Sequence, residues 1–129
     1  RREYYDEHFI SNAVSSSVGK ISDQIEAKLI IALTEKGTTA RRISRHRHSQ
    51  TIIALSPDIA TIRKMNFSWG VIPYLIEKTK NFEHMREQAM QIAKKNDVCP
   101  LGKDDPFVIV AGMPFGQSGT TNMIFIERV

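Results

Sequence analysis

The chain has 129 residues, of which 41% are hydrophobic and 25% charged, and its formal net charge is +4. We expect one domain, residues 1–129, since this length and composition are ordinary for a globular chain with a buried core. No apolar run approaches the roughly 20 residues of a membrane-spanning helix, and the charged start shows no secretory signal. The single cysteine, Cys99, excludes an internal disulfide and suits a reducing, cytoplasmic location.

Helical and strand patterns alternate along the chain, which is typical of an α/β fold. Apolar side chains spaced three and four residues apart indicate helices, and short uninterrupted apolar runs indicate buried strands. The predicted helices are 9–26, 40–46, 57–65 and 81–95, and the predicted strands are 28–33, 51–55, 71–76, 107–111 and 123–126.

Three details of these elements follow from their residues. Ser56 is expected to be the N-cap of the third helix, with Pro57 in its first position. Pro73 has no amide proton, which favours an edge position for the third strand. The first helix is expected to face the core with an apolar stripe of Phe9, Ala13, Val14, Val18, Ile21 and Ile25.

Strands that alternate with helices predict a mostly parallel sheet with both faces covered. Only a Gly-rich connection, 112–121, separates the last two strands, so we expect a hairpin and an antiparallel last strand. Ligands of such sheets bind outside the carboxyl ends of the strands, where the strand order reverses. If strands 28–33 and 107–111 are neighbours, the loops that follow them converge on one pocket.

The loop after the first strand combines one glycine with hydroxyl and cationic side chains, at Thr34, Lys36, Gly37, Thr38 and Thr39. It leads into a helix, whose first backbone N–H groups lack internal partners and attract anions. The loop therefore predicts a phosphate site. The alternative is an ordinary capped helix start, with Thr38 or Thr39 as N-cap.

Basic residues cluster in 41–48. This segment is either a solvated helix face or a source of positive potential that attracts a phosphorylated ligand. A charge of +4 is mild, and no nucleic-acid-binding motif is present, so nucleic-acid binding through residues 41–47 is the disfavoured alternative. His46 and His48, two residues apart, do not present both rings to one side of a helix, so we expect no metal site.

Four sequence blocks closely resemble the C-terminal domain of pyruvate kinases in content, order and spacing. They are TEKGTTAR (34–41), ISRHR (43–47), WGVIP (69–73) and GTTNMI (119–124). A helix that runs into the first strand matches as well, and the resemblance covers about residues 11–129. Each block alone is a weak signal, but four in register identify the family.

The resemblance implies a three-layer α/β/α domain with a five-stranded mixed sheet whose last strand is antiparallel. It also implies a regulatory role in a tetrameric glycolytic enzyme that converts phosphoenolpyruvate and ADP to pyruvate and ATP. An effector phosphate is expected in the 34–39 loop described above. The second wall of its site is expected at Gly116, Gln117, Ser118 and Gly119.

The catalytic residues of such enzymes, and their Mg and K ions, lie in a β/α barrel that this sequence does not contain. We therefore expect a part of a longer enzyme, with no catalytic residue, no cofactor and no phosphoryl transfer by the chain alone. Segment 123–126 is expected to support homo-oligomers: a tetramer in the parent enzyme, and a monomer or weak dimer for this chain.

Departures from the family pattern favour an effector with one phosphate. Members that bind fructose 1,6-bisphosphate often hold its second phosphate with a Trp and an Arg. Here segment 77–87 contains Phe82 and Arg86 but no Trp, and Arg86 does not align. Glu35, in the loop itself, would repel a doubly charged phosphate. A sugar monophosphate or AMP fits better; the alternative is a free-standing, flavodoxin-like phosphate- or nucleotide-sensing domain. His48 replaces the family's usual proline, and we assign it no function.

Overall fold

The computed structural model describes residues 7–46, 49–68, 70–113, 115–116 and 120–129, with the backbone alone at 7–8 and 66–68. All nine predicted elements are present there, in the predicted order. The helices are α1 (Glu7–Gln24), α2 (Thr38–Ser44), α3 (Ile59–Ser68) and α4 (Phe82–Lys95). The strands are β1 (Leu29–Leu33), β2 (Thr51–Ser56), β3 (Ile72–Leu75), β4 (Pro106–Ala111) and β5 (Met123–Arg128).

The strands form one mixed sheet in the order β3-β2-β1-β4-β5. β1 pairs in parallel with both β2 and β4, and β3 is parallel to β2. β5 is antiparallel to β4, as the short Gly-rich connection predicted. Pro73 lies on the edge strand β3, where its missing amide proton breaks no central ladder.

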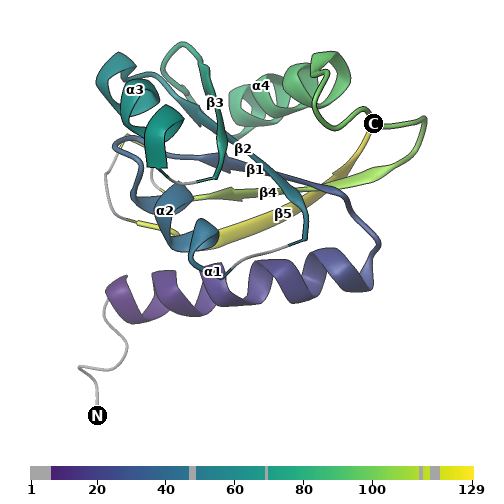
Figure 1. The fold of residues 1–129 in the computed structure, drawn as a ribbon, viewed down its shortest axis with the longest axis horizontal. Helices are drawn as coiled ribbons and strands as arrows, with labels where there is room; N and C mark the ends of the chain where they lie inside the picture. The colour runs from purple at the N-terminus through teal and green to yellow at the C-terminus, as the bar shows by residue number, and fades with distance from the viewer. Residues whose placement is uncertain (1–6, 47–48, 69, 114, 117–119) are drawn as a thin grey trace.

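Helices cover both faces of the sheet, with α1 and α4 on opposite sides (Figure 1). Successive strand residues point to opposite faces, so β1, with all five residues buried, contributes to two cores. Ile30 and Ala32 pack with Val18 of α1 and with residues of α2 and α3. Leu29, Ile31 and Leu33 pack with Met85 and Ala89 of α4. The predicted three-layer α/β/α architecture is confirmed.

The stripe predicted for α1 is partly wrong. Phe9 is 46% exposed and Ala13 is also exposed, whereas Ser11, Ser15 and Ser22 are fully buried beside Val18. Serine can face the core when its hydroxyl finds a partner. Ser22 Oγ donates to the Val18 carbonyl (2.8 Å), and Ser11 Oγ accepts the amide proton of Thr121 (2.9 Å). The small hydroxyl side chains replace part of the expected apolar stripe.

The prediction that Ser56 caps the third helix is wrong. Ser56 ends β2, and its Oγ accepts the amide proton of Asp58 (3.1 Å). Asp58 Oδ1 in turn accepts the amide proton of Ala60 (3.2 Å), so Asp58 caps α3 and Pro57 lies before the helix. None of the helices among the described residues is both long and apolar enough to cross a membrane.

Candidate functional site

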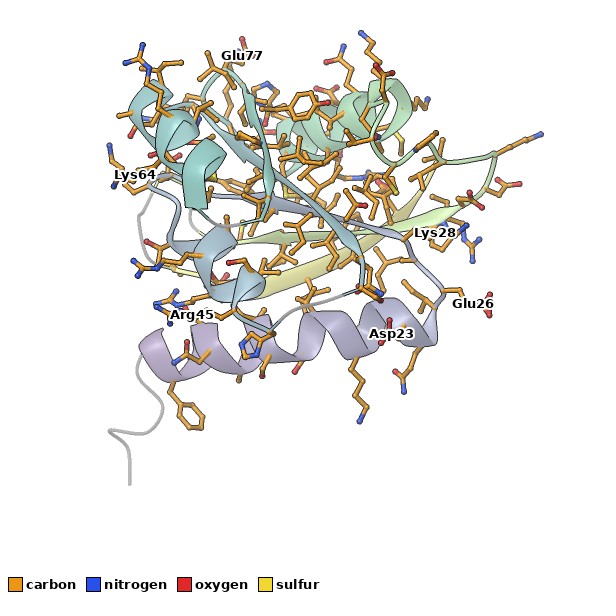
Figure 2. All side chains as sticks on the ribbon, in the orientation of Figure 1. Asp23, Glu26, Lys28, Arg45, Lys64 and Glu77 are labelled. Atoms are coloured by element: carbon orange, nitrogen blue, oxygen red, sulfur yellow. The ribbon has the colours of Figure 1, made fainter. Side chains whose placement is uncertain are left out.

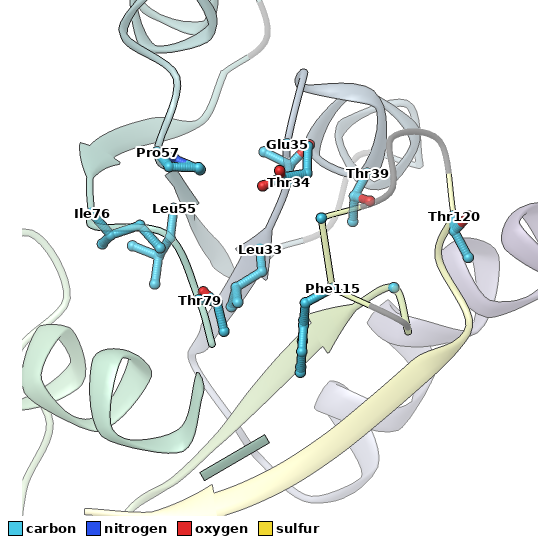
Figure 3. A pocket seen from close by; sticks show the side chains of 12 residues that line it. Leu33, Thr34, Glu35, Thr39, Leu55, Pro57, Ile76, Thr79, Phe115 and Thr120 are labelled. Atoms are coloured by element: carbon cyan, nitrogen blue, oxygen red, sulfur yellow. The ribbon is translucent and has the colours of Figure 1, made fainter. Parts of the chain in front are cut away.

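A cleft opens at the carboxyl ends of β1, β2 and β4, where the strand order reverses between β1 and β4. Its position is the one predicted for a ligand site in this class of sheet. Figure 3 shows Leu55, Pro57 and Ile76 on one side of Leu33, and Thr39, Phe115 and Thr120 on the other. The lining residues are Leu33, Thr34, Glu35, Thr39, Leu55, Pro57, Ile76, Thr79, Gly112, Phe115, Gly116 and Thr120.

The loop between β1 and α2 turns sharply at Gly37. Gly37 has a φ of 95°, a left-handed conformation that favours glycine, and it is the N-cap of α2 without a side-chain cap. The alternative in which Thr38 or Thr39 caps the helix is therefore wrong. Thr34 Oγ1 accepts the Gly37 amide proton (2.8 Å). Its own hydroxyl proton remains available to donate to a ligand.

Thr39 and Thr121 join the two walls of the cleft. Their Oγ1 atoms are 2.7 Å apart, and the two residues are 3% and 0% exposed. The amide of Thr121 donates to Ser11 Oγ of α1 at 2.9 Å. One chain of buried hydrogen bonds thus connects the start of α2, the segment before β5 and α1.

The wall that precedes β5 lies tightly against the end of β4. A Cβ atom at Gly112 would lie 1.8 Å from the Thr120 carbonyl oxygen, so only glycine fits there. The Asn122 side chain accepts the Met113 amide proton and donates to the Met113 carbonyl, both at 2.9 Å. Thr120 and Thr121 are therefore held at the cleft by backbone contact and by a paired amide.

The structure describes only part of the predicted second wall. Gly116 lines the cleft with a φ of 92°. Gln117, Ser118 and Gly119, which the resemblance assigned to the same wall, lie outside the described residues. Phe115 and Thr79 were not predicted and have no distinctive sequence signal. Pro57 and Ile76 directly follow β2 and β3, so the rule that ligands bind at strand carboxyl ends could have found them.

The predicted phosphate residues face two separate hollows. Thr34 and Thr39 line the cleft, whereas Lys36, Gly37 and Thr38 line a groove on the other side of the loop. We call this second hollow the basic groove; its other lining residues are Asn12, Arg41, Arg42, Arg45 and Lys64. Figure 2 shows Arg45 and Lys64 toward one end of the molecule and Lys28 toward the other.

Electrostatics differ between the two hollows. Among the described residues that line the cleft, none is Lys or Arg, and Glu35 is the only carboxylate. In the basic groove, burial and the neighbouring Arg45 both lower the pKa of Arg42. Lys36 Nζ lies 3.0 Å from Asp58 Oδ2, so the loop lysine is bound to the cap of α3.

Arg86 lies away from the cleft. Its guanidinium contacts Glu127 of β5 at 2.7 Å and Glu83 at 3.1 Å, and it lies over the Phe125 ring at 5.6 Å. The pKa of Arg86 is raised, mostly by its hydrogen bond to Glu127 and next by electrostatic attraction to the same carboxylate. The only Arg in segment 77–87 is thus used to tie α4 to β5.

No cluster of three or more metal-ligating side chains occurs in the part of the chain that the structure describes. The thiol of Cys99 is buried and lies 3.6 Å from the Lys28 carbonyl oxygen. Neither observation adds a reactive group to the cleft.

Comparisons with known proteins agree on one family. Residues 12–127 match the family described as "Pyruvate kinase, alpha/beta domain". Pyruvate kinase from Lactobacillus delbrueckii subsp. bulgaricus is 39% identical over 129 residues, which are 100% of this chain and 22% of that protein. Pyruvate kinase from Lactococcus lactis subsp. lactis is 39% identical over 127 residues, 98% of this chain and 25% of that protein.

The fold agrees as well. The crystal structure of Cryptosporidium parvum pyruvate kinase superimposes with a TM-score of 0.76 and 29% identity, covering 92% of this chain and 22% of that one. The chain thus spans only about a quarter or less of the length of these relatives. Family match, sequence identity and fold all lead to one assignment: the chain belongs to the pyruvate kinase family and corresponds to its C-terminal α/β domain.

Proposed function

We propose that this chain is the regulatory domain of a pyruvate kinase and binds a small molecule with one phosphate group at the 34–39 loop. The whole enzyme is then a cytoplasmic tetramer that converts phosphoenolpyruvate and ADP to pyruvate and ATP. Its Mg and K ions belong to the catalytic barrel, and this chain supplies the effector site.

The observation that carries the proposal is the group of hydroxyls at the β1–β4 switch. Thr34 and Thr39 line the cleft at the start of α2, next to the positive-φ turn at Gly37. Phosphate oxygens accept hydrogen bonds, so hydroxyl and backbone N–H donors suit them. The cleft also offers apolar surface from Leu33, Leu55 and Phe115, against which the rest of a ligand can pack.

Charge in the cleft favours one phosphate over two. The described lining holds a carboxylate, Glu35, and no cation. Arg86 is engaged by Glu127 and Glu83, which leaves no guanidinium from that helix for a second phosphate. A carboxylate suits the hydroxyls of a sugar, which can donate to it. We therefore propose a sugar monophosphate or a nucleoside monophosphate as the effector class.

The basic groove supports the same function at a distance. Its five cationic side chains lie on the outer side of the loop whose inner side lines the cleft. Such a concentration of positive charge raises the local concentration of anions and speeds their association. The groove thus attracts a phosphorylated ligand without contacting it in the cleft.

Calorimetric titration tests the proposal. Ribose 5-phosphate, glucose 6-phosphate and AMP are titrated into the chain beside fructose 1,6-bisphosphate, and one of the monophosphates should bind more tightly than the bisphosphate. Replacing both cleft-lining threonines of the loop, Thr34 and Thr39, by Ala should weaken this binding, because each lost charge-assisted hydrogen bond costs about 1.5–3 kcal/mol.

A matched control tests whether loss of affinity is specific to the hydroxyls of the loop or follows from removing any hydroxyl. Thr51→Ala removes a hydroxyl from the first residue of β2, at the opposite end of the sheet from the cleft, and should leave affinity unchanged. Equal affinity of the loop double variant and the unchanged chain would contradict the assignment. Tighter binding of the bisphosphate would contradict the effector class.

A further inference from the structure

We propose that Thr121 is a positioning residue for the effector phosphate: it donates its hydroxyl proton to Thr39, so that Thr39 can donate its own to the phosphate. The inference rests on the proposed function and deepens it. It assigns a role to a residue that does not itself line the cleft, although its neighbour Thr120 does.

The hydroxyls of Thr39 and Thr121 contact each other directly in a buried position. Thr39 Oγ1 and Thr121 Oγ1 are 2.7 Å apart, and the two residues are almost completely buried, so little water competes for this contact. Either oxygen can be the donor in the absence of a ligand. Of the two residues, only Thr39 lines the cleft and can be reached by a bound molecule.

Hydrogen-bond chemistry then fixes the direction once phosphate binds. A phosphate oxygen without a proton only accepts, so Thr39 must turn its single hydroxyl proton toward the ligand. Thr39 Oγ1 is then free to accept, and the Thr121 hydroxyl, 2.7 Å away, can donate to it. Without Thr121, the Thr39 oxygen would lose its buried donor, and an unsatisfied buried polar atom is costly.

Thr121 is held in the position that this role requires. Its amide donates to Ser11 Oγ at 2.9 Å. The neighbouring Thr120 backbone lies against Gly112, where no Cβ fits, and Asn122 is bonded to Met113 through both ends of its side-chain amide. Because the backbone on both sides is fixed, the Thr121 side chain is carried from a fixed position beside Thr39.

A double-mutant cycle tests the inference. Inorganic phosphate and ribose 5-phosphate are titrated by calorimetry into the unchanged chain, Thr121→Val, Thr39→Val and the double variant. Thr121→Val should weaken binding by about fivefold, as expected for one neutral hydrogen bond. Thr39→Val should weaken it at least as much. The double variant should bind like Thr39→Val alone, because Thr121 acts only through Thr39.

Two further variants distinguish positioning from a merely structural role. Thr121→Ser keeps the hydroxyl and should restore affinity. Ser22→Ala removes another buried hydroxyl, bonded to the Val18 carbonyl, and should lower stability without changing affinity. Should Thr121→Val fail to fold, Thr121→Ala replaces it in the cycle, since it removes the same hydroxyl that contacts Thr39.

The possible outcomes separate this inference from the function on which it rests. Loss of binding in Thr39→Val with unchanged binding in Thr121→Val overturns the role of Thr121 and leaves the effector site intact. Additive losses in the double variant also overturn it. Absence of any phosphate binding by the unchanged chain overturns both.

Discussion

Glu26, two residues after the last residue of α1, has a backbone conformation that is unusual for its residue type. Its φ is 60°, in the left-handed region. The following amide, from Ala27, donates to the Ser22 carbonyl at 2.8 Å, which is the bond that closes a helix through a left-handed residue. Glycine commonly occupies such a position because other residues bring their Cβ too close to the next carbonyl.

Glu26→Gly should therefore stabilise the domain. Relief of the left-handed strain is worth about 1–2 kcal/mol, and the greater freedom of glycine in the unfolded chain offsets about 0.5–1 kcal/mol of it. Chemical denaturation should show a net gain of up to about 1.5 kcal/mol on these figures. Glu26→Ala keeps the strain and serves as control; equal stability of the Gly and Ala variants would contradict the argument.

At the scale of elements, Asp58 connects α3 to the loop before α2. One of its carboxylate oxygens caps α3 through the amide of Ala60, and the other accepts from Thr61 (2.9 Å) and Lys36 (3.0 Å). The hydrogen bond from Lys36, and then that from Thr61, lower the pKa of Asp58. The ionised carboxylate thus holds Lys36 on the outer side of the loop.

This contact should make stability fall in acid. Because the folded chain lowers the pKa of Asp58, the contribution is fully present above its unfolded value of about 3.9 and is lost as the pH falls through the lowered value. Asp58→Asn keeps a good cap but removes the charge. Thermal unfolding from pH 7 to pH 3 should show a lower Tm for this variant at pH 7 and a smaller acid-induced decrease.

The control for this measurement is Asp97→Asn, an exposed carboxylate in the segment after α4. Its pH profile should follow that of the unchanged chain. An identical decrease in Tm for Asp58→Asn and the unchanged chain would mean that the Asp58–Lys36 contact contributes nothing.

The sequence predicted best those elements in which the buried positions are occupied by apolar residues at regular spacing. β1 is an unbroken apolar run, and α4 repeats its apolar residues at helical spacing, so both were predicted to within one residue at each end. The buried face of α1 was misassigned because three of its members are serines: Ser11 Oγ accepts from Thr121, Ser22 Oγ donates to Val18 within the helix, and Ser15 Oγ has no hydrogen-bond partner among the described residues. The start of α3 was missed by two residues because Asp58, rather than Ser56, provides the cap.

In the candidate site, too, some features could be predicted from the sequence and others could not. The meeting of the 34–39 loop with the segment after β4 was predictable from the strand alternation, because β1 and β4 lie side by side at the switch. The contact of Thr39 with Thr121 was not, since it joins residues far apart in the chain. Nor could the sequence predict that Lys36 turns away from the cleft, because that depends on where Asp58 lies.

Viewed as a whole molecule, the sheet has β5 at one edge, with its outer side unpaired among the described strands. Ile126 is 45% exposed there. Glu127, which could discourage edge pairing, is bound to Arg86 with only 14% of its side chain exposed. We propose that this edge supports weak self-association of the chain and contributes to the tetramer of the parent enzyme.

Sedimentation velocity over a concentration series checks this proposal. The unchanged chain should form dimers whose population rises with concentration, and Ile126→Lys should abolish them because it places a charge on the exposed edge. Ile59→Lys, at a residue of α3 that is 48% exposed, is the matched control and should leave association unchanged. A monomer mass at millimolar concentration would contradict self-association.

The position of β1 in the middle of the sheet has a consequence for folding order. Ile30 pairs with Ile52 in β2, nearby in the chain, and with Val108 in β4, which is far away. Closing the shorter loop costs less entropy, so the unit β1–β2–β3 can form before the β4–β5 hairpin joins it. The cleft lies on the seam between these two units, so it exists only after the last long-range pairing has formed. A molecule bound there touches both units, and its binding free energy opposes their separation.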